Sequence, residues 1–117
     1  MRFEDRLRSI LKASGCEYSV EDLLFKIEKK EIVSFEYLGV LILIEVQQFP
    51  QKKVLHIWGM EGEGALSHLT EIVSWLKNLA LALGCEELRC QGRAGWERAL
   101  RSLGAAPLYT TLSMKVS

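Results

Sequence analysis

Three closely spaced glycines, Gly59, Gly62 and Gly64, follow the apolar run Val54–Trp58 and are the first candidates for a functional site. A pyrophosphate group is held by several backbone N–H groups that converge on it, and glycines let the backbone come close to the anion. The sequence predicts a helix from Ala65, whose N-terminal dipole would favour the same negative charge. The turn is therefore a candidate phosphate site, and a purely structural strand-to-helix connection is the alternative.

Acidic residues lie inside the same turn and oppose that interpretation. Glu61 and Glu63 alternate with the glycines. Each carboxylate at about 4 to 6 Å from a bound phosphate would cost on the order of 1 kcal/mol or more near the surface. The sequence leaves both readings of the turn open.

Candidates for acid–base chemistry are few. Glu45 lies in a very apolar run, where it is either a buried base whose pKa burial raises or a strand carboxylate that faces solvent. Tyr109 approaches from the last predicted strand as a second candidate. His56 and His68 flank the glycine turn, but no Ser or Cys is placed to form a nucleophilic pair with them.

The elements that position these residues follow from periodicity. A long helix is predicted from Ala65, with an apolar face at three-and-four spacing, and Gly84 ends it. A shorter helix in GRAGWERALRSLG ends at Gly104, and strands are predicted at Leu88–Gln91 and Tyr109–Val116. The two helical faces comprise Leu69, Ile72, Val73, Leu76, Leu79, Ala80 and Leu83, and then Trp96, Ala99, Leu100 and Leu103.

The N-terminal half predicts two helices and a meander. Residues 1–31 contain the helices, the second of which begins at a capping box of Ser19 and Asp22. Residues 32–60 contain three antiparallel strands, at Ile32–Tyr37, Val40–Gln47 and Val54–Trp58. The middle strand is so apolar that we expect it to be buried on both faces at the centre of the sheet.

Composition predicts a single domain over residues 1–117. Fifteen basic and 15 acidic residues cancel, so no net field attracts nucleic acid or an anionic membrane. The longest apolar run, Val40–Ile44, is too short to span a bilayer, and we expect a cytoplasmic protein. Cys16, Cys85 and Cys90 lack the spacing of a zinc site, which favours free thiols and no metal.

The order strand, glycine turn, helix, strand, helix, strand resembles the C-terminal half of the GNAT (GCN5-related N-acetyltransferase) superfamily. The stretches LGCEEL, GRAGW and RSLGA look like the small GNAT-like proteins of tailed phages and prophages. The resemblance implies an α/β (α+β) fold: one GNAT-like domain with a mixed, mostly antiparallel sheet, two N-terminal helices, a long helix after the central strand and a short helix before the last strand.

The resemblance also implies acetyl-CoA as cofactor, held at Gly59, Gly62, Gly64, Ala65 and Arg93. The sequence has Gly59-x-x-Gly62-x-Gly64 where the family has Q/R-x-x-G-x-G/A. Arg93 stands where the family has Asn and belongs to a basic cluster suited to a CoA 3′-phosphate, an acidic protein surface or solvent. The other members of this cluster are Arg89, Arg98 and Arg101.

Catalysis is less well supported by the resemblance. The family's motif Y-x-x-x-G-F supplies a Tyr that protonates the CoA thiolate, but here Leu100 and Ala105 occupy the Tyr and Phe positions. One hypothesis is a non-catalytic protein of virion structure or assembly that works through protein contacts. The alternative is an active N-acetyltransferase with Glu45 or Tyr109 as acid–base groups. The shortened sheet, with its exposed edges, favours a protein partner or a homo-oligomer.

Overall fold

The computed structural model describes residues 2–12, 17–91, 94–109 and 112–116. Its centre is a four-stranded sheet in the order β1-β2-β3-β4. The strands are β1 (Val33–Tyr37), β2 (Val40–Gln48), β3 (Lys53–Glu61) and β4 (Glu87–Cys90). Neighbours among β1, β2 and β3 are antiparallel, as the meander prediction required, and β3 pairs with β4 in parallel.

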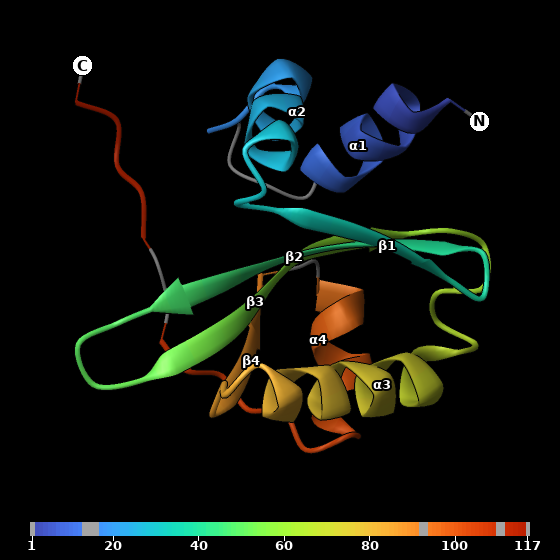
Figure 1. Ribbon diagram of the computed structural model, residues 1–117, viewed down its shortest axis with the longest axis vertical. Coiled ribbons are helices and arrows are strands. Elements are labelled where there is room, and N and C mark those ends of the chain that lie inside the picture. Colours follow the sequence, from blue (N-terminus) through green and yellow to red (C-terminus); the bar gives the residue numbers. More distant parts are fainter. Residues whose placement is uncertain (1, 13–16, 92–93, 110–111, 117) are drawn as a thin grey trace.

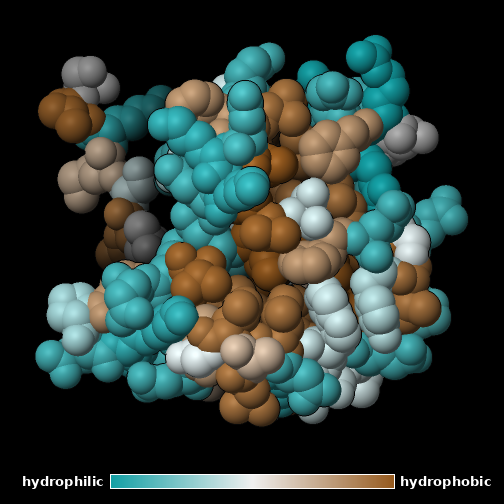
Figure 2. Space-filling view, in the orientation of Figure 1, coloured by the Kyte–Doolittle hydropathy of each residue, from teal (hydrophilic) through white to brown (hydrophobic). Residues whose placement is uncertain are grey.

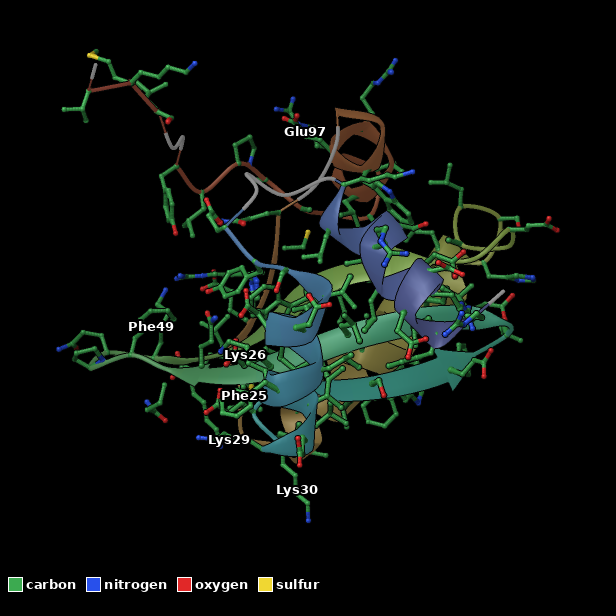
Figure 3. The ribbon with its side chains drawn as sticks, turned by 90° about the horizontal axis from the view of Figure 1, so that it is seen from above. Phe25, Lys26, Lys29, Lys30, Phe49 and Glu97 are labelled. Carbon is green, nitrogen blue, oxygen red and sulfur yellow. The ribbon has the colours of Figure 1, made fainter. Side chains whose placement is uncertain are left out.

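Helices cover both faces of the sheet (Figure 1). The helices α1 (Phe3–Leu11) and α2 (Val20–Glu28) lie on one face, and α3 (Leu69–Ala82) and α4 (Ala94–Arg101) lie on the other. Figure 3 looks onto the α1–α2 layer and shows both helices over the sheet. The molecule is therefore a three-layer α+β domain, and the predicted fold class is confirmed.

Strand β2 contributes side chains to both hydrophobic cores of the domain. All five residues from Val40 to Ile44 are buried, which confirms the prediction of burial on both faces. Val40, Ile42 and Ile44 pack in the core under α3, whereas Leu41 and Leu43 pack in the core under α1 and α2. Because side chains alternate along a strand, one apolar run fills both cores.

The predicted capping box forms at the start of α2. The Ser19 side chain accepts a hydrogen bond from the Asp22 N–H (3.1 Å), and the Asp22 carboxylate accepts one from the Ser19 N–H (2.8 Å). These bonds satisfy two backbone donors that the helix leaves free, and the one from the Ser19 N–H to the carboxylate is the main cause of the lowered pKa of Asp22.

Helix α3 begins at Leu69 and not at Ala65, so the predicted start was four residues early. Residues 62–68 form turns instead, in which the Ala65 N–H donates to the Gly62 carbonyl (3.2 Å) and the His68 N–H donates to that of Gly64 (2.9 Å). The predicted stop at Gly84 is confirmed, because its φ is +75° and the next N–H, from Cys85, returns to the Ala80 carbonyl.

The predicted last strand, Tyr109–Val116, is wrong for the residues that the structure describes there. Tyr109 and residues 112–116 form neither helix nor strand. Alternating apolar residues need a neighbouring strand before they can form a ladder, and no described residue pairs with the outer edge of β4. The apolar side chains of this segment, Tyr109, Leu112, Met114 and Val116, are 70 to 103% exposed.

No helix in the described part of the chain has the length and apolar character needed to cross a membrane. The described residues also contain no cluster of three His, Cys, Asp or Glu residues suited to a metal ion.

Candidate functional site

The parallel pair β3–β4 separates before β3 ends. Their register runs from Val54 opposite Glu87 to Ile57 opposite Cys90, and β3 then continues for four more residues to Glu61. At the same place β3 is irregular against β2, since Ile57 lies opposite Ile44 but Gly59 lies opposite Leu43. Trp58 is thus an extra residue, as in a β-bulge, and bulges increase the local bend of a strand.

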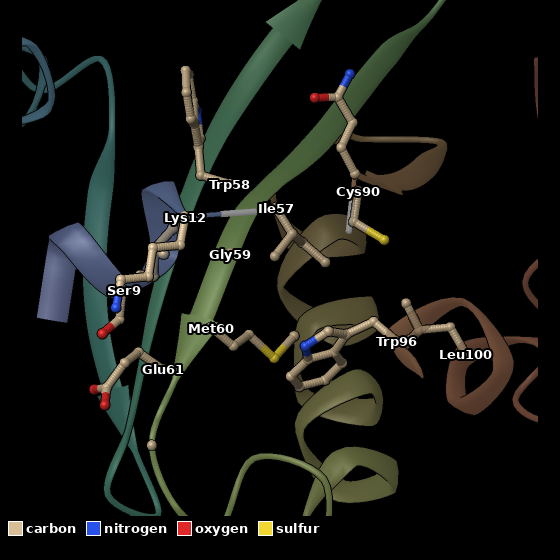
Figure 4. Close-up of a pocket in the computed structure, with 13 residues that line it drawn as sticks. Ser9, Lys12, Ile57, Trp58, Gly59, Met60, Glu61, Cys90, Trp96 and Leu100 are labelled. Carbon is tan, nitrogen blue, oxygen red and sulfur yellow. The ribbon is translucent and has the colours of Figure 1, made fainter. Parts of the chain in front are cut away.

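A cavity of about 480 Å³ occupies the space that this separation opens. This volume lies in the usual range for pockets that bind small molecules. In Figure 4 Met60 and Trp96 point toward one another across the cleft, and Ser9 and Lys12 of the α1 end lie beside it. Figure 2 shows apolar side chains gathered at the middle of one face, between the α1–α2 layer and α3. The cleft is lined by Ser9, Ile10, Lys12, Ile57, Trp58, Gly59, Met60, Glu61, Gly62, Cys90, Gln91, Trp96 and Leu100.

Gly59 lies inside β3 and not in the turn where the sequence prediction placed it. A Cβ at this position would come within 2.5 Å of Ile10 Cγ2 in α1. The missing side chain therefore lets α1 approach the bulged strand closely, and Gly59 still lines the cleft.

Gly62 follows β3 directly, and its conformation requires glycine. Its φ is +151°, and a Cβ would lie 2.9 Å from the Gly39 carbonyl oxygen and 3.0 Å from Val40 Cα. Among the described residues, no hydrogen bond is donated by the backbone N–H groups of Glu63 or Gly64. Two backbone N–H groups without a described partner therefore follow directly on Gly62, which lines the cleft, and an anion site requires such donors.

The Glu61 carboxylate is paired with Arg6. This pairing offsets the repulsion that a free carboxylate would exert on a phosphate bound at the turn. Arg6 Nε donates to the Glu61 carboxylate, and Nη2 donates to the Glu61 carbonyl (3.1 Å) and the Gly39 carbonyl (3.0 Å). Arg6 Nη1 also donates to Glu36 (2.9 Å). The hydrogen bond to Glu61 raises the pKa of Arg6, which stays charged. Glu63, in contrast, is exposed.

The structure places the other predicted residues in different environments. Glu45 does not line the cleft: it accepts a hydrogen bond from Trp58 Nε1 (3.1 Å) and lies 3.8 Å from Lys26 Nζ, beside α2. Tyr109 is 70% exposed and does not line the cleft either. Ala65 is buried in the core, with its N–H engaged inside the turn. Arg93 lies outside the described residues.

The rest of the predicted basic cluster is partly neutralised. Arg89 donates to Glu87 (2.8 Å) and Arg101 donates to Glu97 (2.7 Å). Gly64 lies two positions after Gly62 in the sequence but does not line the cleft. The structure therefore brings together Gly59 and Gly62 at the cleft and leaves Glu45 and Tyr109 elsewhere.

Two residues of the cleft lining bear on the chemistry that the cleft could support. Leu100 lines the cleft from α4, where the resemblance placed the Tyr position, so no proton donor stands at that point. Cys90, the last residue of β4, also lines the cleft, and although the residue is exposed to solvent, the partial burial of its thiol raises the pKa of that thiol. The sequence analysis did not predict Cys90 as a site residue. Its position in β4 opposite Ile57 would have indicated a place beside the cleft if parallel pairing of β3 and β4 had been assumed.

The histidines flank the cleft without lining it. His56 lies on β3 beside Trp58, with ring centroids 5.6 Å apart. Burial lowers the pKa of His56, Glu45 opposes this effect, and Arg89 adds to it. His68 lies in the turns before α3, 3.8 Å from Glu71.

Comparison with solved structures relates this arrangement to known proteins. No family model and no curated protein matches the sequence. A probable acetyltransferase of known structure superposes over 98% of this chain and 87% of its own, with a TM-score of 0.67 and 13% identity. The fold is that of the GNAT acetyltransferases.

Two further GNAT-fold neighbours have named activities. Glucosamine-6-phosphate N-acetyltransferase from Arabidopsis thaliana matches with a TM-score of 0.62 and 14% identity, over 98% of this chain and 89% of its own. An acetyltransferase from Trypanosoma brucei matches with a TM-score of 0.60 and 15% identity, over 98% and 96% of the two chains. At these identities the likeness to GNAT proteins is one of fold.

Proposed function

We propose that this GNAT-fold protein binds acetyl-CoA in the cleft between β3 and β4, and that it is a non-catalytic or degenerate acetyltransferase that acts through protein contacts. The observation that carries the proposal is the combination of an open cleft with Leu100 in its lining. The volume of the cleft supports the binding of a small-molecule cofactor, whereas Leu100 supplies no proton for a departing thiolate.

The fit to acetyl-CoA rests on the backbone as well as on the cavity. Beyond Ile57 the edge of β3 that faces β4 has no described strand beside it. The pantetheine arm of CoA is an extended chain with two amides, which suits an open strand edge. The backbone donors of Glu63 and Gly64 would hold phosphate oxygens, and Lys12 is the cationic side chain in the described lining. When bound, the cofactor would supply an activated acetyl thioester.

The proposal of protein contacts rests on exposed apolar side chains and open sheet edges. Leu112, Met114 and Val116 are 88 to 103% exposed, and Leu81 on α3 is 75% exposed. In the described residues β1 and β4 each have one edge without a neighbouring strand. Such surfaces are typical of proteins that bind a partner or a second copy. The likeness to phage and prophage proteins makes virion assembly the context that we propose.

Thermal unfolding with and without acetyl-CoA tests the binding. Acetyl-CoA at about 100 times its Kd adds about 2.7 kcal/mol, or about 8 to 15 °C in Tm for a domain of this size. Gly62→Asp should abolish the shift because it places a side chain and a negative charge at the turn. Gly104→Asp is the matched control, since Gly104 also has a positive φ but has open space around it and does not line the cleft.

The absence of turnover is tested separately by thiol release from acetyl-CoA in the presence of amines such as peptide N-termini, lysine and amino sugars. We expect no release above the rate of the uncatalysed reaction. Clear turnover with any amine would favour the second candidate, an active N-acetyltransferase. The observation in favour of that candidate is the cleft itself, with its volume of about 480 Å³. No Tm shift at millimolar acetyl-CoA would contradict the cofactor proposal.

A further inference from the structure

Arg6 joins three elements at the entrance to the glycine turn. From α1 it reaches the turn between β1 and β2 through the Gly39 carbonyl, and the end of β3 through Glu61. The side chains of Arg6 and Glu61 are only 17% and 19% exposed, so this pair is screened less than a surface pair. Glu61 is also the residue directly before Gly62, and it lines the cleft.

We propose that Arg6 is a positioning residue that neutralises the Glu61 carboxylate and thereby allows the glycine turn to accept a phosphate-bearing ligand. The inference rests on the proposed binding of acetyl-CoA. Without Arg6, Glu61 would place an unpaired negative charge in the lining, next to the backbone donors of residues 63 and 64. Arg6 holds both the carboxylate and the carbonyl of Glu61, so it fixes the side chain and the backbone at this point.

The other acidic groups near Arg6 do not replace Glu61 in this role. Glu36 accepts one hydrogen bond from Arg6, but its side chain is 64% exposed and does not line the cleft. Glu63 lies with Arg6, Gly39, Glu61 and Gly62 around a second, open hollow of about 270 Å³, and it is exposed to solvent. Solvent screens both of these charges more than it screens the partly buried Arg6–Glu61 pair, which is why we assign the positioning role to that pair.

The test compares two ligands in Arg6→Met, which removes the charge and keeps an apolar stem. Acetyl-CoA carries phosphates, whereas S-acetylpantetheine has the same thioester arm without them. We expect Arg6→Met to weaken the binding of acetyl-CoA about ten- to hundredfold, the effect of one unpaired charge at about 6 Å at an effective dielectric of about 40 to 20. The affinity for S-acetylpantetheine, measured by chemical-shift titration, should stay unchanged.

Rescue and a matched control separate charge from structure. The double variant Arg6→Met/Glu61→Gln should restore the wild-type affinity for acetyl-CoA, because it removes both charges of the pair. Arg8→Met removes the same formal charge from the same helix, where Arg8 pairs with the exposed Asp5, and should change nothing. Equal weakening of both ligands by Arg6→Met, or no rescue by Glu61→Gln, would overturn the inference.

Glu61→Gln alone keeps the test decisive if Arg6→Met fails to fold. It leaves Arg6 charged near the turn, so acetyl-CoA should bind with unchanged or higher affinity, and S-acetylpantetheine should be unaffected. Weaker binding of acetyl-CoA by Glu61→Gln would contradict the inference. A wild-type protein that binds neither ligand would instead refute the proposed function.

Discussion

At the scale of single residues, the proposed lack of acetyl transfer rests on Leu100. This aliphatic side chain lines the cleft, and the resemblance to the GNAT family places there a Tyr that protonates the leaving thiolate. We therefore predict that Leu100→Tyr raises the rate of thiol release from acetyl-CoA with amine acceptors by about tenfold or more, given that a positioned general acid contributes about 10² to 10⁴. The measurement is steady-state thiol release.

Leu103→Tyr is the control for that substitution. Leu103 follows α4, belongs to the same segment and does not line the cleft, so the variant should release thiol at the wild-type rate. A Leu100→Tyr protein that folds and binds acetyl-CoA but shows no gain would mean that more than one proton donor is missing.

Cys90 offers a direct report on occupancy of the cleft. Burial raises the pKa of its thiol, so little thiolate is present at pH 7.5 and alkylation by iodoacetamide should be slower than for a free cysteine. We predict that saturating acetyl-CoA slows this alkylation at least fivefold or so, because the ligand covers a lining residue. Mass spectrometry of the peptide that contains Cys90 separates it from the buried Cys85. Equal rates with and without ligand would place acetyl-CoA elsewhere.

At the scale of elements, the capping box fixes the start of α2 and so the position of the α1–α2 layer. Ser19→Ala removes the hydrogen bond to the Asp22 N–H, and we predict a loss of about 0.5 to 2 kcal/mol in the free energy of unfolding. Urea unfolding measures it. Ser113→Ala, in the exposed C-terminal segment, is the matched control and should change stability by less than about 0.5 kcal/mol.

Local sequence signals predict those elements whose stabilising contacts are themselves local. The box at Ser19, the stop at Gly84 and the two-sided burial of Val40–Ile44 are each visible in a few consecutive residues, and each is confirmed. The resemblance, together with the order of elements, also gives the fold. The start of α3 was missed because Ala65 is apolar and continues the helical pattern, although it packs at a turn.

The candidate site was predicted only in part, because long-range pairing builds it. Gly59 and Gly62, predicted as cofactor-binding residues, both line the cleft, but the structural reason for Gly59 is the close approach of Ile10, 49 positions earlier in the sequence. The bulge at Trp58 and the pairing of Arg6 with Glu61 depend on register and on helix docking, neither of which has a local signal. Glu45 was chosen as a carboxylate in an apolar strand and Tyr109 as a phenol in the predicted last strand, and neither lines the cleft.

At the scale of the whole molecule, His56 makes stability depend on pH. Its pKa is lowered in the folded state by burial, so between its folded and unfolded pKa values the unfolded chain binds more protons. Stability from this group is therefore present above about pH 6.5 and is lost as the pH falls. Glu45 opposes the shift and Arg89 adds to it.

We predict that the free energy of unfolding falls between pH 7.5 and pH 5 and that His56→Gln reduces this fall. Urea unfolding at the two pH values measures it. Asp22 and Glu87, whose pKa values are lowered, lose their contributions at more acidic pH and do not mask the effect. An identical fall in wild type and variant would exclude His56 as the source.

The separation of β3 from β4 also has a consequence for the order in which the chain folds. The antiparallel β1–β2–β3 unit closes short loops and can form early, whereas β4 joins by a parallel crossover through α3, which brings together residues far apart in sequence. The cleft exists only after β4 has docked over four residues and diverged. A ligand of this cleft should therefore slow unfolding and leave the refolding rate almost unchanged, because its site is completed late.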